Sequence, residues 1–407
     1  MRLITLISFF IIPWAVACQP QTTVVENNIQ PAAWQTEAYL PLMEGKRVAA
    51  VVNHTSHIGN THLVDSLLAM GVNLKTIFAP EHGFRGEAGA GEHIQNSTDS
   101  KTGLPIISLY GKNKKPQPDQ LKDIDLVIFD IQDVGARFYT YISTMHYVME
   151  ACAEQDKQML ILDRPNPNGY YVDGPVLELE QQSFVGMHPI PVVHGLTVGE
   201  LAQMINGEGW LAGGKQCALE IIKVKNYDHT DNYSLPIRPS PNLPNDHAIN
   251  LYPSLCFFEG TAMSVGRGTD FPFQVVGYPD PIFATLKSTE VQPVDTFSFV
   301  PQDVPGAAMN PDHEGKRCYG LDFRNEERLS SFTLDYLMLF YKKAADLGMS
   351  NEDFFREDFF DLLAGTKKLR AQLTSGVSEN EIRRSWTDDL NLYKTMRKKY
   401  LLYDDFE

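Results

Sequence analysis

The sequence lacks the glycine-rich motifs with which many α/β proteins hold phosphate groups. No G-x-G-x-x-G follows the first predicted strand, residues 47–52, and no G-x-x-x-x-G-K-[ST] occurs in the chain. Without such a loop, backbone amides cannot cradle a pyrophosphate at a helix N-terminus. NAD and ATP are therefore disfavoured as ligands, and we expect no cofactor.

The motifs of common metal and serine hydrolases are also missing. There is no H-E-x-x-H and no G-x-S-x-G, and Ser240 lies among prolines rather than at a strand–helix elbow. Five histidines could still bind a metal: His54, His57, His62, His82 and His93. Their spacing matches no known ligand pattern, so we predict no metal site. A metal-dependent hydrolase that uses His54, His57 and His82 stays open as an alternative.

Cysteine is scarce, and none of the five cysteines forms a C-x-x-C pair, which makes a zinc ribbon unlikely on spacing alone. Four of them are widely spaced, and we predict that they are buried free thiols: Cys152, Cys217, Cys256 and Cys318. The fifth, Cys18, lies in a different context near the N-terminus.

The N-terminus has the features of a targeting segment. Arg2 precedes an almost wholly apolar stretch, residues 3–16, that is too short to span a bilayer, and residues 15–17 fit a small-x-small cleavage site. Because Cys18 follows that site and a polar segment comes next, we predict a signal peptide over 1–17, lipidation of Cys18 and a lipoprotein tether over 18–35. Plain secretion is the alternative. Either way we expect the mature protein to leave the cytoplasm for the periplasm, where a lipid on Cys18 would be its one contact with the membrane.

Basic residues are few. The chain has 35 lysines and arginines against 51 aspartates and glutamates, a formal net charge of -16. Nucleic acids and anionic membrane surfaces are bound by basic faces, so we exclude both as partners of the folded part. A small anion would need a local site built from arginines, for which the candidates are Arg85, Arg137 and Arg267.

What the sequence does contain is an alternation of apolar strands and amphipathic helices. Strands are predicted at residues 47–52, 74–79, 106–110, 124–131, 159–162 and 219–225, and helices at 61–70, 140–156 and 196–207. Fully apolar strands that alternate with helices are typical of the α/β class. We predict a Rossmann-like, doubly wound, mostly parallel sheet. Thr197 and Glu200 form a T-x-x-E capping box, which makes Glu200 structural.

The proline-rich stretch 227–246 separates this pattern from the rest of the chain, because proline at that density continues neither a helix nor a central strand. We therefore predict an N-terminal catalytic domain over 36–250. A second, smaller α/β or α+β domain over 251–407 would complete the cleft, with helices at 331–347 and 353–365 and a helix pair within 379–400.

Polar clusters follow four of the predicted strands, at 53–54, 81–82, 130–137 and 163–168. In a parallel sheet the carboxyl ends of the strands share one edge, where ligands bind. Glu81, between Pro80 and Gly83, is our candidate for a general acid or acid/base, since glycosidases use a pair of carboxylates. The second group could be Glu92 or Asp130, and other options are Asp133, Glu259 and Asp270. A structural pairing of Glu81 with Arg85 is the alternative.

A polar substrate bound at this edge would need groups for its hydroxyls, its ring face and any carboxylate. The candidates are Asn53, His82, Arg85, Arg137, Tyr139, Asn166 and Arg267. Tyr139 could stack on a sugar face, but it could equally be a core aromatic.

Six long segments together resemble the NamZ family of exo-β-N-acetylmuramidases, formerly a DUF1343-type domain of unknown function. They are residues 79–86 (APEHGFRG), 130–141 (DIQDVGARFYTY), 163–175 (DRPNPNGYYVDGP), 191–200 (PVVHGLTVGE), 238–242 (RPSPN) and 258–270 (FEGTAMSVGRGTD). The resemblance runs from about residue 37 to the C-terminus.

The resemblance implies a Rossmann-like domain, a smaller C-terminal domain and a cleft between them. It also implies release of N-acetylmuramic acid from the non-reducing end of peptidoglycan fragments, and so muramyl sugars as partners. The resemblance points to the glutamate of the PEHG segment, Glu81, as a catalytic candidate. A non-catalytic periplasmic lipoprotein that binds such fragments remains the alternative.

Overall fold

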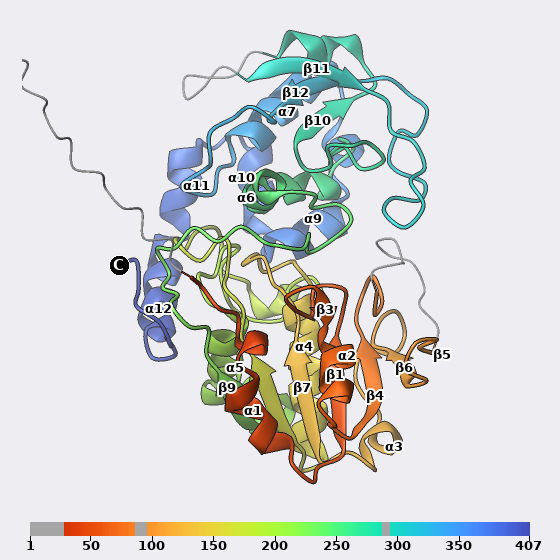
Figure 1. Ribbon diagram of the computed structural model, residues 1–407. Coiled ribbons are helices and arrows are strands. Elements are labelled where there is room, and N and C mark those ends of the chain that lie inside the picture. Colours follow the sequence, from red (N-terminus) through yellow and green to blue (C-terminus); the bar gives the residue numbers. More distant parts are fainter. Residues whose placement is uncertain (1–27, 86–95, 287–293) are drawn as a thin grey trace, which may run out of the picture.

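The computed structural model describes residues 28–85, 96–286 and 294–407. In Figure 1 a larger sheet with helices on both faces lies below, and a smaller sheet with its own helices lies above. The predicted α/β class and the smaller second domain are thus confirmed. The predictions for the signal peptide, Cys18, Glu92 and His93 concern residues outside the described part of the chain.

The larger sheet is mostly parallel. Its seven strands run in the order β5-β6-β4-β1-β7-β8-β9, and each neighbouring pair is parallel except β5–β6. The strands are β1 Val48–Val52, β4 Leu74–Ala79, β5 Ser97–Thr98, β6 Pro105–Ser108, β7 Leu126–Asp130, β8 Gln158–Leu162 and β9 Ala218–Ile222. Every residue of β1 and β7 is buried, because helices cover both faces of the sheet.

Alternate residues of β1 belong to two different cores. Ala49 and Val51 face the core that contains α4 Tyr141–Glu154 and α5 Val198–Gly207. Val48, Ala50 and Val52 face the core that contains α1 Thr36–Met43 and α2 Leu63–Ala69. The period of two along a strand therefore places one set of side chains under each helical layer. The capping box at Thr197 and Glu200 is present as predicted.

The sequence pattern placed the start of α2 too early. Residues 61–62 form β3, Thr61–His62, which pairs with β2, His57–Ile58, in a two-residue-turn hairpin. Gly59 in that turn has φ +54°, a conformation that glycine adopts without steric cost. The helix begins at Leu63, and His62 caps it.

The smaller domain begins with a helix rather than with a linker. The predicted boundary at residue 250 lies inside α6, Asp246–Leu255. The sheet of this unit is antiparallel, in the order β10-β12-β11, and was not predicted. Its strands are β10 Val275–Tyr278, β11 Asp295–Phe299 and β12 Cys318–Asp322, and its later helices are α7 Asp335–Asp346, α8 Asn351–Phe354, α9 Glu357–Ala364, α10 Lys368–Thr374, α11 Glu379–Ser385 and α12 Thr387–Arg397. One more short helix, α3 Pro118–Leu121, belongs to the larger domain.

The final residues return to the larger domain, where α12 and the C-terminus lie in Figure 1. The hydroxyl of Tyr403 donates to Asp163 at 2.6 Å, and the backbone amide of Leu402 donates to Glu200 at 2.8 Å. The backbone amide of His229 donates to the carbonyl of Asp404 at 3.0 Å. Residues 398–407 therefore complete a buried polar network at the end of β8.

The predicted tether is shorter than expected at its C-terminal end. Ala32 and Ala33 are fully buried in the short helix η1, Ala32–Trp34, and Gln30 forms a β-bridge with Lys225. Residues 30–35 therefore belong to the folded domain. Within the described part of the chain, no helix has the length and apolarity needed to cross a membrane.

Candidate active site

The carboxyl ends of four parallel strands bring the predicted polar residues to one edge of the larger sheet. Asn53 follows β1 directly, Glu81 comes two residues after β4, Asp130 ends β7 and Asp163 follows β8. β1 lies between β4 and β7 in the sheet, so Asn53 occupies the middle of this edge. The edge therefore has the position at which open α/β sheets bind ligands.

Glu81 is held by side chains from two other segments. Thr140 donates its hydroxyl to Oε2 of Glu81 at 3.0 Å, and the hydroxyl of Tyr141 lies 3.5 Å from the Glu81 carbonyl oxygen. Tyr110, just beyond β6, is also hydrogen-bonded to the Glu81 side chain. Burial, with the nearby Glu81 carboxylate, raises the pKa of Tyr110 well above its usual value, so its phenol stays protonated and can donate.

Tyr110 and Thr140 were not singled out in the sequence, although both carried a signal. Tyr110 ends the short strand predicted at 106–110, so it occupies the same edge as Glu81. Thr140 lies in the segment 130–141 that follows β7. Both residues could have been found by counting uncharged hydroxyl groups among the polar side chains that follow the parallel strands.

His82 adopts a backbone conformation that is uncommon for residues other than glycine, with φ +67°. Its imidazole is buried, and its Nε2 lies 3.4 Å from the hydroxyl of Ser240. Nearby, Nε2 of His54 donates to the carbonyl of Arg238 at 2.9 Å, and burial lowers the pKa of His54 to about 4. The proline-rich segment 238–242 thus packs over the strand exits and closes one side of the site.

The smaller domain contributes a cation. Arg267 donates through Nε to Glu259 at 2.6 Å and lies over the ring of Phe273, 5.1 Å from its centroid. Phe273 packs edge-on against Tyr252, which packs against Tyr139, and Tyr139 packs against Tyr141, whose hydroxyl lies 3.5 Å from the Glu81 carbonyl oxygen. The side chain of Arg267 remains 27% exposed. A continuous row of packed aromatic rings thus connects this guanidinium of the smaller domain with the Glu81 segment of the larger one.

Asp130 is not available as the second carboxylate. It is fully buried, and both of its oxygens accept from Arg164, at 2.6 and 2.9 Å. A buried charge needs such a partner, because desolvation would otherwise cost several kcal/mol. Asp130 therefore neutralises Arg164 beneath the site, which corrects the catalytic role that we predicted for it.

Arg137 is also a structural residue rather than a substrate-binding one. Its fully buried guanidinium donates to the carbonyls of Pro175 and Ile190 at 2.7 and 2.8 Å, and to those of Leu363 and Ala364 at 2.9 and 2.7 Å. The last two carbonyls end helix α9 of the smaller domain, and a cation favours a helix C-terminus. Arg137 therefore connects the two domains.

Arg85 and Asn166 are likewise bonded within the fold. Arg85 donates to Asp99 at 3.0 Å and pairs with Asp65 at 3.5 Å. Partial burial alone would raise the pKa of Asp99, but hydrogen bonds from Arg85 and Thr102 hold it at about 2. The buried Asn166 side chain donates to Leu196 and accepts from Asn168, both at 2.9 Å. Asn166 is therefore held within the fold, whereas the side chain of Arg85 is 30% exposed and its contact with the substrate stays a prediction.

Asn53 and Tyr139 are buried beside the site and are bonded within the fold. The side-chain oxygen of Asn53 accepts from the amide and the hydroxyl of Thr55, at 2.9 and 2.6 Å. Tyr139 is buried, donates to the carbonyl of Pro239 at 2.7 Å and packs edge-on against Tyr141. Both residues support the site from below. The four described cysteines after Cys18 are buried and free, as predicted.

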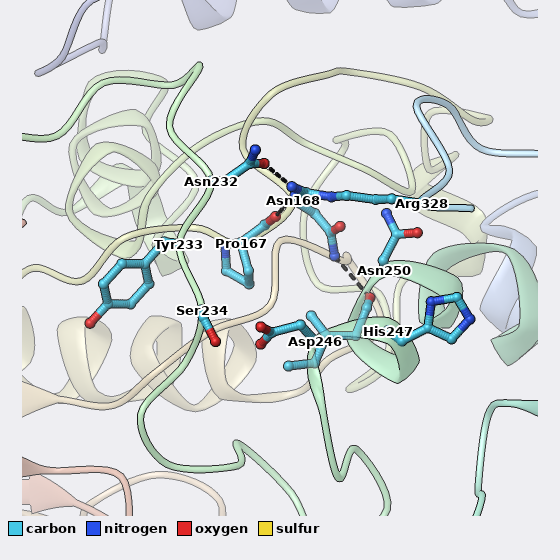
Figure 2. A pocket seen from close by; sticks show the side chains of 10 residues that line it. Pro167, Asn168, Asn232, Tyr233, Ser234, Asp246, His247, Asn250 and Arg328 are labelled. Atoms are coloured by element: carbon cyan, nitrogen blue, oxygen red, sulfur yellow. Dashed lines mark hydrogen bonds between the residues drawn. The ribbon is translucent and has the colours of Figure 1, made fainter. Parts of the chain in front are cut away.

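A separate cavity of about 340 Å³ lies near the end of β8 and the start of α6 (Figure 2). Its lining includes Asn168, Asn232, Asp246 and Arg328. Figure 2 shows Arg328 bonded to the Asn232 side chain and to the Pro167 carbonyl. Among the described residues that line it, Asp246 is the one carboxylate, so these residues offer no carboxylate pair with which to cleave a glycosidic bond.

The histidines do not converge on a metal site within residues 28–85, 96–286 and 294–407. No group of three or more His, Cys, Asp or Glu side chains there has the arrangement of a metal site. His62 instead accepts from the amide of Val64 and donates to the carbonyl of Asn53, at 3.2 and 2.9 Å.

Comparison with known proteins covers nearly the whole described chain. Residues 48–247 match the family described as exo-beta-N-acetylmuramidase NamZ, N-terminal, and residues 250–403 match its C-terminal counterpart. The peptidoglycan beta-N-acetylmuramidase NamZ of Bacillus subtilis (strain 168) is 38% identical over 382 residues, which cover 90% of this chain and 89% of that protein.

Two crystal structures of DUF1343 family proteins from Bacteroides fragilis NCTC 9343 have the same fold. One is 46% identical, with a TM-score of 0.82 over 93% of this chain and 99% of that one. The other is 32% identical, with a TM-score of 0.78 over 92% and 99% of the two chains.

Proposed function

The chain belongs to the exo-beta-N-acetylmuramidase NamZ family and is a glycoside hydrolase, and from this premise we propose that it releases N-acetylmuramic acid from the non-reducing end of peptidoglycan fragments. Such a reaction serves the turnover and recycling of the cell wall. The substrate is a sugar that carries an acidic lactyl group. Its site therefore needs a proton donor for the glycosidic oxygen and a cation for the carboxylate.

The observation that carries the proposal is the position of Glu81 at the carboxyl edge of the parallel sheet, where Thr140 and Tyr110 hold its side chain. Packed aromatic rings connect this edge with Arg267 of the smaller domain. Nε of Arg267 donates to Glu259, and we assign the two terminal nitrogens of the guanidinium to the lactyl carboxylate. A planar guanidinium can bind a carboxylate through two parallel hydrogen bonds.

In the proposed reaction Glu81 is the general acid. It transfers its proton to the glycosidic oxygen as the bond to the anomeric carbon breaks, and the leaving sugar departs as an alcohol. Glu81 then accepts a proton from the water that completes hydrolysis. Thr140 fixes the orientation of the carboxyl group throughout. Glu92, which follows in the same polar segment of the sequence, remains our candidate for the second carboxylate.

The first test is hydrolysis of a chromogenic N-acetylmuramide and of its N-acetylglucosamine counterpart by residues 19–407, with and without EDTA. We expect release from the muramide alone, at the same rate with the chelator. Glu81→Gln should retain the fold and lose at least about a thousandfold in kcat. Full activity of this variant would refute the assignment of Glu81, and a loss with EDTA that added metal restores would favour the metal hydrolase.

We further propose that the protein is exported and anchored by a lipid on Cys18. This proposal rests on the apolar segment 3–16 and on the position of Cys18 directly after residues 15–17. Metabolic labelling with a radioactive fatty acid should mark the wild type but not Cys18→Ser, and the variant should leave the membrane fraction. An unlabelled wild type in the soluble periplasmic fraction would instead show plain secretion.

A further inference from the structure

A shallow recess of about 120 Å³ lies in the smaller domain beside Arg267. Its lining includes Glu259, Arg267, Asp312, Arg356 and Phe359. Glu259 and Arg267 are the ion pair described above, so the recess adjoins the guanidinium that we assign to the lactyl carboxylate. Whatever binds in the recess therefore lies next to the sugar whose carboxylate we assign to Arg267.

The rim of the recess carries an exposed aromatic ring. Phe359, in the first turn of α9, is 38% exposed, whereas the neighbouring Phe360 is fully buried. The exposure of Phe359 leaves one apolar surface open beside polar groups. A flat apolar ring next to hydrogen-bonding groups is what the C–H face of a pyranose needs, because one face of the sugar packs while its edge stays hydrated.

The polar groups of the recess are balanced in charge. Arg356 pairs with Asp312 at 2.7 Å, and Arg267 pairs with Glu259 at 2.6 Å, which gives two cations and two anions. The side chains of Arg356 and Asp312 are 47% and 42% exposed, and an ion pair so exposed contributes little to stability. Arg356 and Asp312 can therefore give up part of this ion pair and bind sugar hydroxyls instead, at a small cost in free energy. This balance favours a neutral ligand.

We propose that this recess is the binding subsite for the leaving sugar, a neutral N-acetylated hexosamine. The ring of that sugar would pack on Phe359, and its hydroxyls would bond to Arg356 and Asp312. This inference rests on the proposed function. An exo-acting enzyme encloses the terminal sugar and leaves the next sugar near the opening, which agrees with the exposed position of Phe359.

The test compares two substrates in Phe359→Ala. We expect kcat/KM for the disaccharide muramyl-N-acetylglucosamine to fall about tenfold, since loss of one aromatic contact typically costs about that factor. The value for 4-nitrophenyl N-acetylmuramide should change less than about twofold, because its reactive leaving group depends little on binding. Phe359→Tyr should restore the disaccharide activity. Leu392→Ala, which truncates an exposed apolar side chain on α12, is the control and should change neither value.

Product inhibition gives a second measurement of the same subsite. Free N-acetylglucosamine should inhibit hydrolysis of the nitrophenyl muramide, with an inhibition constant about tenfold higher in Phe359→Ala than in the wild type. Equal losses on both substrates, or no loss on either, would overturn the subsite while leaving the muramidase function intact. A wild type that cleaves neither muramide would overturn both proposals.

Discussion

At the scale of single residues, the orientation of Glu81 depends on Thr140, since the hydroxyl of Thr140 donates to Oε2 at 3.0 Å. Thr140→Val removes this donor and keeps the shape of the side chain. We expect kcat on the chromogenic muramide to fall up to about tenfold, because a typical hydrogen bond contributes about 0.5–1.5 kcal/mol. Steady-state kinetics should show an unchanged KM.

The control for this prediction is Thr140→Ser, which keeps the hydroxyl and should retain most of the activity. If the serine variant were as slow as the valine variant, loss of packing rather than of the hydrogen bond would explain the effect.

Arg267 determines recognition of the carboxylate in our proposal, so its loss should affect binding more than the chemical step. For Arg267→Gln we expect kcat/KM on the muramide to fall about 10- to 100-fold, mainly through KM, since a charge-assisted contact contributes about 1.5–3 kcal/mol. The matched control is Arg324→Gln, because Arg324 pairs with Asp322 in the same domain and does not line the recess beside Arg267. A fall in kcat alone would contradict the assignment.

The sequence suggests Glu81 and Arg267 as candidates because each lies in a polar segment that contains glycine, and such a segment seldom forms part of a hydrophobic core. It could not show that Asp130 and Arg137 are used within the fold. The partner of Asp130, Arg164, is 34 residues away, and two carbonyls bonded to Arg137 are 226 and 227 residues away. Whether a charged side chain is exposed or neutralised depends on such distant contacts, which local pattern does not contain.

At the scale of elements, helix α2 has an unusual cap. Nδ1 of His62 accepts from the amide of Val64, which requires a neutral imidazole. Burial, opposed in part by the bond to Asn53, lowers the pKa of His62 from 6.5 to about 4. A histidine with a lowered pKa adds stability above pH 6.5, and this stability is lost as the pH falls toward 4.

Urea unfolding of the wild type should therefore show a loss of up to about 3 kcal/mol between pH 6.5 and 4 from this residue. In His62→Asn the amide oxygen can still cap the helix, so the loss over that range should be smaller. The comparison isolates His62, because buried His54, whose pKa also falls to about 4, is present in both proteins. Parallel pH profiles of the two proteins would refute the role of His62.

The larger sheet was predictable because its parallel strands are buried on both faces and appear as apolar runs. The antiparallel sheet was not. Its middle strand, β12, contains Gly320, whose missing side chain allows close approach of β10, since a Cβ atom there would lie 1.9 Å from the carbonyl oxygen of Val276. A strand that contacts its neighbour through a glycine lacks the regular alternation of apolar and polar residues. Its sequence therefore resembles that of a loop.

At the scale of the whole molecule, Arg137 holds the two domains together. Arg137→Met would leave four buried carbonyls without their donor, two in each domain. We expect the free energy of unfolding to fall by about 3 kcal/mol or more, since an unsatisfied buried polar group costs about 1–3 kcal/mol. Differential scanning calorimetry should show a lower Tm and separation of the domains into two transitions.

Arg384→Met is the control, because Arg384 is an exposed arginine of α11. A single transition at the wild-type Tm in Arg137→Met would show that other contacts join the domains.

The return of residues 398–407 to the larger domain has a consequence for biosynthesis. Tyr403 bonds to Asp163 across 240 residues of chain, and the network that it completes lies at the end of β8. A domain that emerges first from the ribosome usually folds while the rest is still being made. Here the first domain cannot complete its buried network until translation has passed the whole second domain. The native hydrogen bonding of the larger domain is therefore complete only after residues 398–407 have been synthesised.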